Sequence, residues 1–294
     1  MNSKSSSTSV SVRRTVTAVT AVAGILAAVG AVIYACAYKR SYDPIIHHYE
    51  RGSALITVSA VLLFAVLVCS VLPSVKLRKK YSLSDSSPNG SEILTFWLCA
   101  FMFIGFGIIS VTEGYGADTS SAVGRICAFL EAPVSILSAL PFICAASEKL
   151  RCGIVHRITS FFPVVWGICQ IFKYYFDLSE IPLNDPELAI TVTVVSSVVL
   201  FFLSENRNAM LTNSPAICSF ASLAAVCFAG TISCARIILC FTDNLAFPSI
   251  MENVMLFCIA LSALTRICAL PSRITEKSAE ETEKEKKLGK SERK

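Results

Sequence analysis

Apolar stretches that are each about long enough to cross a lipid bilayer recur along the whole chain. An α-helix needs about 20 residues to span the roughly 30 Å of hydrocarbon in a membrane. These segments cover residues 15–38, 54–72, 93–111, 121–146, 153–175, 187–204, 215–241 and 247–270. We therefore predict an all-α, polytopic integral membrane helix bundle of about eight transmembrane helices, joined by short loops and surrounded by the lipid bilayer.

The composition of the 294-residue chain supports this prediction. Hydrophobic residues make up 54% and charged residues only 16%, with a mean hydropathy of +0.62. A soluble domain needs more polar surface than this composition provides. The net charge of +5 comes from clusters of Lys and Arg near the predicted membrane edges, so it indicates topology. We predict no nucleic-acid partner.

The loop charges predict the orientation of the chain. Lys79, Arg151, Arg207 and Arg273 follow the second, fourth, sixth and eighth segments. The loops on the opposite side are mostly acidic, except that the first carries Lys39, Arg40 and Arg51. Basic loops stay in the cytoplasm. We expect both termini to be cytoplasmic, with the protein in the plasma (cytoplasmic) membrane.

The ends of the chain have a different composition from the apolar segments. Residues 1–14 form a polar cytoplasmic lead, residues 15–270 the transmembrane helical domain, and residues 271–294 a charged cytoplasmic tail. Because its mixed charges bury no core, we expect the tail to be disordered.

The first segment has a second interpretation as a cleaved signal peptide. Arg13 and Arg14 precede its apolar run, and the "ACA" at 35–37 resembles a cleavage site. The run from Val16 to Val32 is longer than the usual apolar region of about 7–15 residues, which favours a retained anchor. Cleavage would leave seven spans.

Proline positions predict several helix ends. Pro186 and Pro215 follow Asp185 and Ser214, an arrangement typical of the first helical residue after an N-cap. Pro73 and Pro271 are expected to mark the C-terminal ends of the second and eighth helices.

The fourth segment carries one carboxylate, Glu131, near its middle. Polar and small residues recur around it at a spacing of three or four, which places them on one helix face: Gly124, Cys127, Glu131, Ser135 and Ser138. A charge that faces lipid at this depth is very costly, so this face is predicted to point into the bundle. Pro133 also frees the backbone carbonyl near Phe129 for binding.

Other polar residues lie within the later segments. Arg236 and Glu252 each lie about five residues from the loop that joins the seventh and eighth segments, so we predict an ion pair between them. The candidate substrate- or ion-binding residues are Glu131, Ser135, Gln170, Arg236 and Glu252.

Sequence motifs for catalysis are missing from the chain. We find no His-Glu-x-x-His zinc motif, no Gly-x-Ser-x-Gly nucleophile turn and no phosphate loop, and the cysteine spacing offers no metal site. We predict no catalytic residue, no metal and no cofactor, and favour a non-enzymatic function.

Two functions remain. Polar residues around Glu131 favour transporter-like binding or movement of a small polar solute through the membrane. The alternative is a non-catalytic structural, sensory or assembly subunit with a membrane protein partner, because small and hydroxylated residues at helical spacing also serve helix packing.

Overall fold

The computed structural model describes residues 3–43, 48–49, 54–77, 81–83, 87–114, 122–147, 149–151, 153–176, 186–210, 212, 214–243 and 250–276. Its helices are α1 (Ser3–Ser41), α2 (Ala54–Leu77), α3 (Gly90–Gly114), α4 (Ala122–Ala146), α5 (Ile154–Thr159), α6 (Phe162–Phe176), α7 (Pro186–Ala209), α8 (Pro215–Ala225), α9 (Thr231–Asp243) and α10 (Ile250–Arg273). A π-helical turn, η2 (Val226–Gly230), joins α8 to α9. The protein is an all-α bundle, as predicted.

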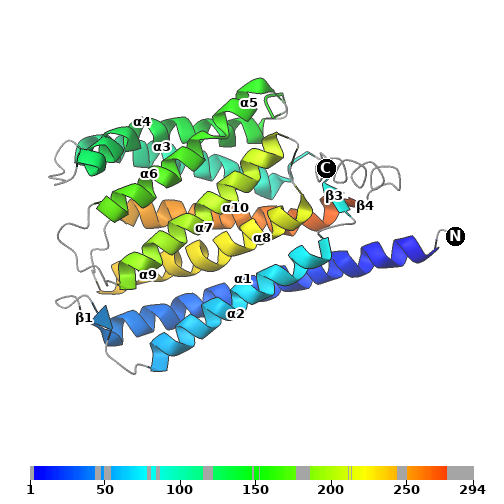
Figure 1. The fold of residues 1–294 in the computed structure, drawn as a ribbon, viewed down its shortest axis with the longest axis horizontal. Helices are drawn as coiled ribbons and strands as arrows, with labels where there is room; N and C mark the ends of the chain where they lie inside the picture. The colour runs from blue at the N-terminus through cyan, green and yellow to red at the C-terminus, as the bar shows by residue number, and fades with distance from the viewer. Residues whose placement is uncertain are drawn as a thin grey trace, which may run out of the picture.

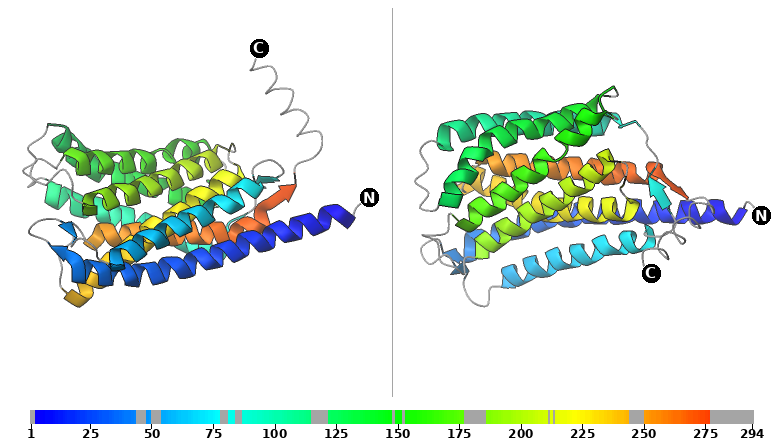
Figure 2. Two further views of the ribbon diagram at one scale, coloured as in Figure 1. Left: turned by 60° about the horizontal axis from the view of Figure 1, so that its bottom comes forward. Right: turned by 45° about the horizontal axis from the view of Figure 1, so that its top comes forward.

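The helices form three adjoining groups (Figure 1). α3, α4 and α6 lie together on one side, α7 to α10 lie in the middle, and α1 and α2 pack on the other side. α10 contacts both α3 and α1, so it lies at the centre of the bundle. The same order is visible from the two other directions in Figure 2.

Two short pairs of antiparallel strands mark opposite ends of the bundle (Figure 1). β1 (Tyr42–Asp43) pairs with β2 (His48–Tyr49) at one end, which we call the β1–β2 end. β3 (Tyr81–Leu83) pairs with β4 (Ile274–Glu276) at the other, the β3–β4 end. α1 begins and α10 finishes at the β3–β4 end.

Within the described residues, seven helical stretches are long and apolar enough to cross a membrane. They are Arg13–Ser41, Gly90–Val111, Arg125–Ala146, Ile154–Tyr175, Pro186–Ala209, Pro215–Thr242 and Ile250–Arg273. α2, with 24 residues, occupies the remaining predicted segment. The tail from residue 277 and the loops around residues 116, 180 and 244 lie outside the described residues.

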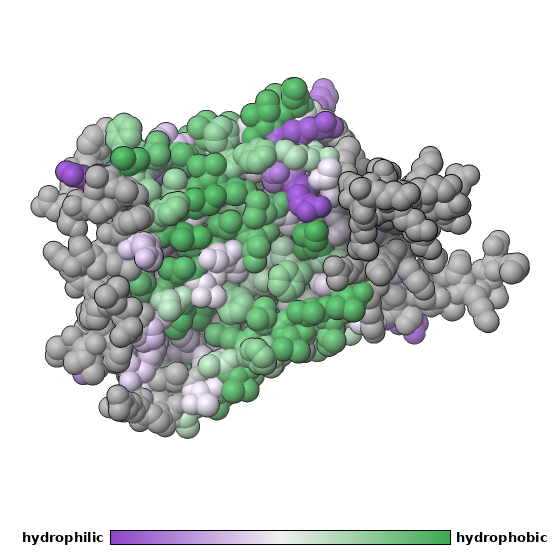
Figure 3. Space-filling model, viewed as in Figure 1, coloured by the Kyte–Doolittle hydropathy of each residue, from purple (hydrophilic) through white to green (hydrophobic). Residues whose placement is uncertain are grey.

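The outer face of the bundle is apolar. Hydrophobic residues cover the sides of the helices in Figure 3. At least two-thirds of the surface is exposed in several large apolar residues, among them Phe64, Leu94, Phe129 and Ile154. So much exposed apolar surface is unfavourable in water but suits lipid. The protein is therefore a multi-pass helical membrane protein.

Two predicted segments are interrupted in the structure. Residues 153–175 form α5 and α6 with a break after Thr159, just before Pro163, the second residue of α6. Proline has no N–H to donate and restricts the residue before it, which ends the preceding helix. Residues 215–241 contain the π-helical turn η2, which packs against α10 and α1.

The proline predictions had mixed outcomes. Pro186 and Pro215 begin α7 and α8, and the Ser214 hydroxyl accepts a hydrogen bond from the Ile217 N–H at 3.3 Å, which confirms the predicted cap. Pro73 and Pro271 lie inside α2 and α10, so the predicted ends there were wrong. A helix continues past proline when neighbouring helices support its last turn.

Aromatic side chains fill the interior between the two ends. The Trp166 ring of α6 meets the Phe103 ring edge-on, with centroids 5.3 Å apart, and Phe103 stacks on Phe142 at 5.6 Å. α3 approaches α4 closely here, because a Cβ atom on Gly107 would lie 3.0 Å from the Ala132 carbonyl oxygen. Glu131 precedes Ala132 in the chain, so it lies next to this close approach.

Candidate functional site

Glu131 lies inside the bundle and is bound by two side chains of α6. Only 4% of Glu131 is exposed. The Gln170 amide Nε2 donates to its Oε1 at 2.6 Å, and the Lys173 Nζ lies 3.0 Å from Oε2 and 3.2 Å from Oε1. The carboxylate is therefore held by one amide donor and one ammonium group.

Lys173 connects this buried carboxylate to the edge of the bundle. It lies three residues before the end of α6, at the β1–β2 end, and 30% of its side chain is exposed. A lysine this close to a membrane edge commonly extends its charge outward to the surface. The structure turns its ammonium group inward, toward Glu131.

Ser135 lies one helical turn further into the bundle than Glu131. Its hydroxyl donates to the Phe103 backbone carbonyl at 2.8 Å. This bond fastens α4 to α3, so the structure gives Ser135 a packing contact rather than a place beside the Glu131 carboxylate.

A second buried carboxylate, Glu187, lies at the start of α7. Arg236 of α9 lies 3.0 Å from its Oε2 and also donates to the Thr191 hydroxyl at 2.7 Å. The hydroxyls of Tyr34 and Tyr49 donate to Glu187 Oε1. Burial, followed by the nearby Tyr34 and Glu187, raises the pKa of Tyr49 in β2 above its usual range, so this hydroxyl stays a neutral donor.

Glu252 of α10 is the third buried carboxylate at this end. Its Oε1 accepts a hydrogen bond from the Tyr174 hydroxyl of α6 at 2.5 Å. The sequence predicted Glu252 as the ion partner of Arg236, whereas the ion pair that the structure forms with Arg236 at 3.0 Å is to Glu187. Glu187 was missed because it is the first residue of the predicted segment 187–204, where a carboxylate is ordinarily solvated. Its spacing of four from Thr191 could have revealed an inward face.

These groups form one buried polar assembly, which we call the carboxylate layer. It consists of Glu131, Glu187 and Glu252 with their partners Gln170, Lys173, Tyr174, Arg236, Thr191, Tyr34 and Tyr49. Tyr174 links Glu252 to the helix that holds Glu131, because its hydroxyl donates to Glu252 and it follows Lys173 directly on α6. Among these described side chains, three carboxylates face two cationic groups, so the layer favours positive charge.

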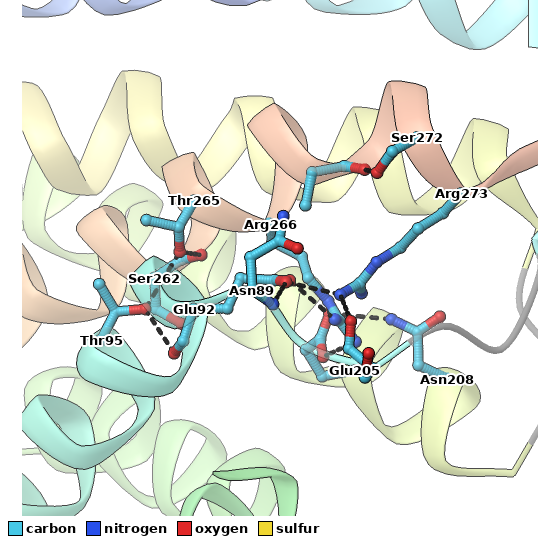
Figure 4. Close-up of polar contacts among 12 residues, drawn as sticks. Asn89, Glu92, Thr95, Glu205, Asn208, Ser262, Thr265, Arg266, Ser272 and Arg273 are labelled. Carbon is cyan, nitrogen blue, oxygen red and sulfur yellow. Dashed lines mark hydrogen bonds and ion pairs between the residues drawn. The ribbon is translucent and has the colours of Figure 1, made fainter.

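A second polar cluster lies toward the β3–β4 end, and we call it the arginine network (Figure 4). Glu92, in the first turn of α3, is fully buried and pairs with Arg273 at 2.5 Å and with Arg266 at 3.1 Å. Arg266 also holds Glu205 of α7 through two parallel bonds of 2.9 Å. Asn208 of α7 donates to Glu205 at 2.9 Å. The network thus ties α3, α7 and α10 together.

The arginine network was not predicted. Arg266 and Glu252 share one face of α10, but they lie 14 positions apart and belong to different clusters. Glu92 and Glu205 lie at segment edges, where a carboxylate is ordinarily solvated. Only the lateral arrangement of α3, α7 and α10 brings the four charged groups together.

Comparisons with known proteins provide no relative: no family model, curated protein or solved structure matches the chain. Among the described residues, no three His, Cys, Asp or Glu side chains are grouped as metal ligands. The two polar clusters are therefore the features of the molecule that indicate a function.

Proposed function

We propose that the protein binds and moves a small polar solute, with the carboxylate layer as its binding region. The observation that supports this most is the contact of Glu131 with Lys173, a buried carboxylate reached from the bundle edge by a partly exposed ammonium group. Charged groups are costly inside a membrane bundle, and apolar side chains of similar size often pack there at no loss of stability. Their presence favours a binding role.

The arrangement of the two polar clusters supports transport in particular. The carboxylate layer lies at the β1–β2 end, the arginine network toward the β3–β4 end, and aromatic side chains separate them. Polar contacts at either end can exchange protein partners for water when that end opens, as alternating access requires. The arginine network would then close one end while the other binds solute.

We further propose eight spans in the plasma membrane, with both termini and the β3–β4 end in the cytoplasm. Reporter fusions after Ser82, Gly116, Glu180 and Asn244 are expected to report inside, outside, outside and outside, in that order. The basis is the charge asymmetry of the loops. Finding Ser82 and Gly116 on the same side would remove the third span and contradict this topology.

The binding role predicts that a solute stabilises the protein through Glu131. Thermal unfolding of the purified chain in lipid nanodiscs would be measured with glycine, ethanolamine, glucose or acetate. At least one is expected to raise the melting temperature of the wild type, because ligands that bind only the folded state stabilise it. Glu131→Gln is expected to fold and to lose this effect, since the amide keeps the shape but not the charge.

Asp43→Asn provides the matched control for this experiment. It makes the same chemical change on β1, outside the carboxylate layer, so it should respond to solutes like the wild type. If the Glu131→Gln protein keeps the full response, the carboxylate does not bind the solute.

A second candidate function is a non-catalytic structural, sensory or assembly subunit. The arginine network favours it, because its ion pairs link three helices without any requirement for a solute. This function gains support if Glu131→Gln and Glu131→Leu both stay folded and a cellular phenotype of the protein is unchanged.

A further inference from the structure

We propose that the group recognised at Glu131 is a primary ammonium, and that the Lys173 side chain occupies its place until a solute arrives. This inference rests on the proposed solute-binding function and names the chemical class of the solute. Its basis is the geometry around Glu131, Gln170 and Lys173.

The Lys173 ammonium already shows what the site accepts. It approaches both oxygens of the Glu131 carboxylate, at 3.0 and 3.2 Å. A charge-assisted contact of this kind is stronger than a neutral hydrogen bond. A free ammonium ion can make the same two contacts.

Lys173 is able to give up this position. Its ammonium group sits on a flexible four-carbon stem, and the residue lies three positions from the end of α6 with 30% of its side chain exposed. The stem can therefore turn outward and hold the charge at the membrane edge. The carboxylate of Glu131 would then remain buried without its cation, which favours a replacement of the same charge.

Gln170 provides the second observation that points to a ligand. Its Nε2 is bound to Glu131, which fixes the amide beside the carboxylate. Its Oε1 is buried and accepts no hydrogen bond from any described residue. An unsatisfied buried acceptor is unfavourable. A primary ammonium has three N–H donors, enough for both Glu131 oxygens and for this amide oxygen.

This donor requirement separates a primary ammonium from other cations. A quaternary ammonium has no N–H group, so it can neutralise Glu131 but cannot satisfy the Gln170 oxygen. Sodium would have to bind these oxygens directly, but hard cations take about six oxygen ligands, and Glu131 and Gln170 provide only their three side-chain oxygens. The site should therefore prefer methylammonium to tetramethylammonium and to sodium.

The test removes the occupant and supplies a free ammonium. Lys173→Ala in lipid nanodiscs is expected to melt below the wild type. Methylammonium chloride should raise its melting temperature in a saturable way by about 3 °C, while tetramethylammonium chloride and sodium chloride at equal ionic strength should not. The double variant Glu131→Gln/Lys173→Ala should lose the response. Arg125→Ala, which deletes an exposed cation from the same end of α4, should not gain it.

A second measurement uses the wild type and does not depend on the stability of a variant. Acylation of Lys173 by a membrane-impermeant amine reagent, quantified by mass spectrometry, should increase severalfold with methylammonium present because the displaced lysine becomes accessible. Unchanged acylation, or equal stabilisation of Lys173→Ala by tetramethylammonium, overturns the inference.

The outcomes also separate this inference from the proposed function. Stabilisation of the wild type by glucose or acetate alone, dependent on Glu131, would keep the binding function and overturn the ammonium class. Stabilisation of Lys173→Ala by methylammonium would support the ammonium site even if the wild type, in which Lys173 occupies that site, responded to no solute in the screen. A wild type that responds to no solute would count against the proposed function alone.

Discussion

Replacing Glu92 by glutamine is expected to lower the free energy of unfolding by about 3–5 kcal/mol, because it leaves a buried guanidinium without its carboxylate. Glu92 is fully buried and pairs with both Arg266 and Arg273. It also accepts the Asn89 backbone N–H at 2.9 Å, which fixes the start of α3. The neutral amide keeps the shape of the side chain, so the loss comes from charge.

Glu205→Gln is the matched control for this prediction. Glu205 makes a two-bond contact with Arg266, but 22% of its side chain is exposed and it is paired with one arginine in the network. Arg266 also keeps Glu92 when Glu205 is changed. Thermal or denaturant unfolding in matched detergent should therefore show a smaller loss for Glu205→Gln. Equal losses in the two variants would mean that burial of Glu92 does not set the strength of the network.

The two variants also test how the network acts in the proposed cycle. If it closes the β3–β4 end, then weakening it should favour opening there before the helices separate. Accessibility of a reporter cysteine at Ser262, buried beside the network on α10, would increase in the Glu205→Gln protein at temperatures where it remains folded. A purely structural network would show no such change until unfolding.

The overall fold followed from the sequence because lipid imposes a strong constraint on it. A segment that crosses a bilayer must bond its backbone within itself, so each long apolar run predicts a helix. The break after Thr159 and the π-helical turn at Val226–Gly230 were not predicted. Hydropathy is insensitive to both, since all of these residues are compatible with a continuous apolar helix. Pro163 could have predicted the first break from the sequence. The π-helical turn packs against α10 and α1, a contact that only the structure shows.

The candidate site was predictable only in part. Helical spacing placed Glu131 on an inward face, because that inference needs one helix and its periodicity. The partners of each charge depend on which helices are neighbours, and no pattern within a single segment contains that information. The prediction therefore named Gln170 without connecting it to Glu131, and missed Glu187 and Glu92. Depth along the helix correctly suggested that Arg236 lies near other charges, but not which helix provides its ion pair.

Replacing Arg236 by methionine is expected to lower the free energy of unfolding by about 3–5 kcal/mol, the second large effect in the chain. The change removes the cation that lies 3.0 Å from Glu187, a carboxylate that two tyrosine hydroxyls also bind. Methionine keeps the length and apolar body of the side chain, so packing is largely retained. Unfolding in matched detergent would measure the loss.

A double-mutant cycle identifies which carboxylate Arg236 depends on. Arg236→Met combined with Glu187→Gln should cost less than the sum of the single changes, with an interaction energy between about 0.5 and 3 kcal/mol, because contacting partners are coupled. Arg236→Met combined with Glu252→Gln should show a smaller coupling, since the Glu252 carboxylate accepts the Tyr174 hydroxyl and Arg236 pairs with Glu187. Coupling to Glu252 that exceeds the coupling to Glu187 would restore the pairing expected from the sequence. In that case Arg236 would stabilise mainly Glu252, and Glu187 would be held chiefly by the hydroxyls of Tyr34 and Tyr49.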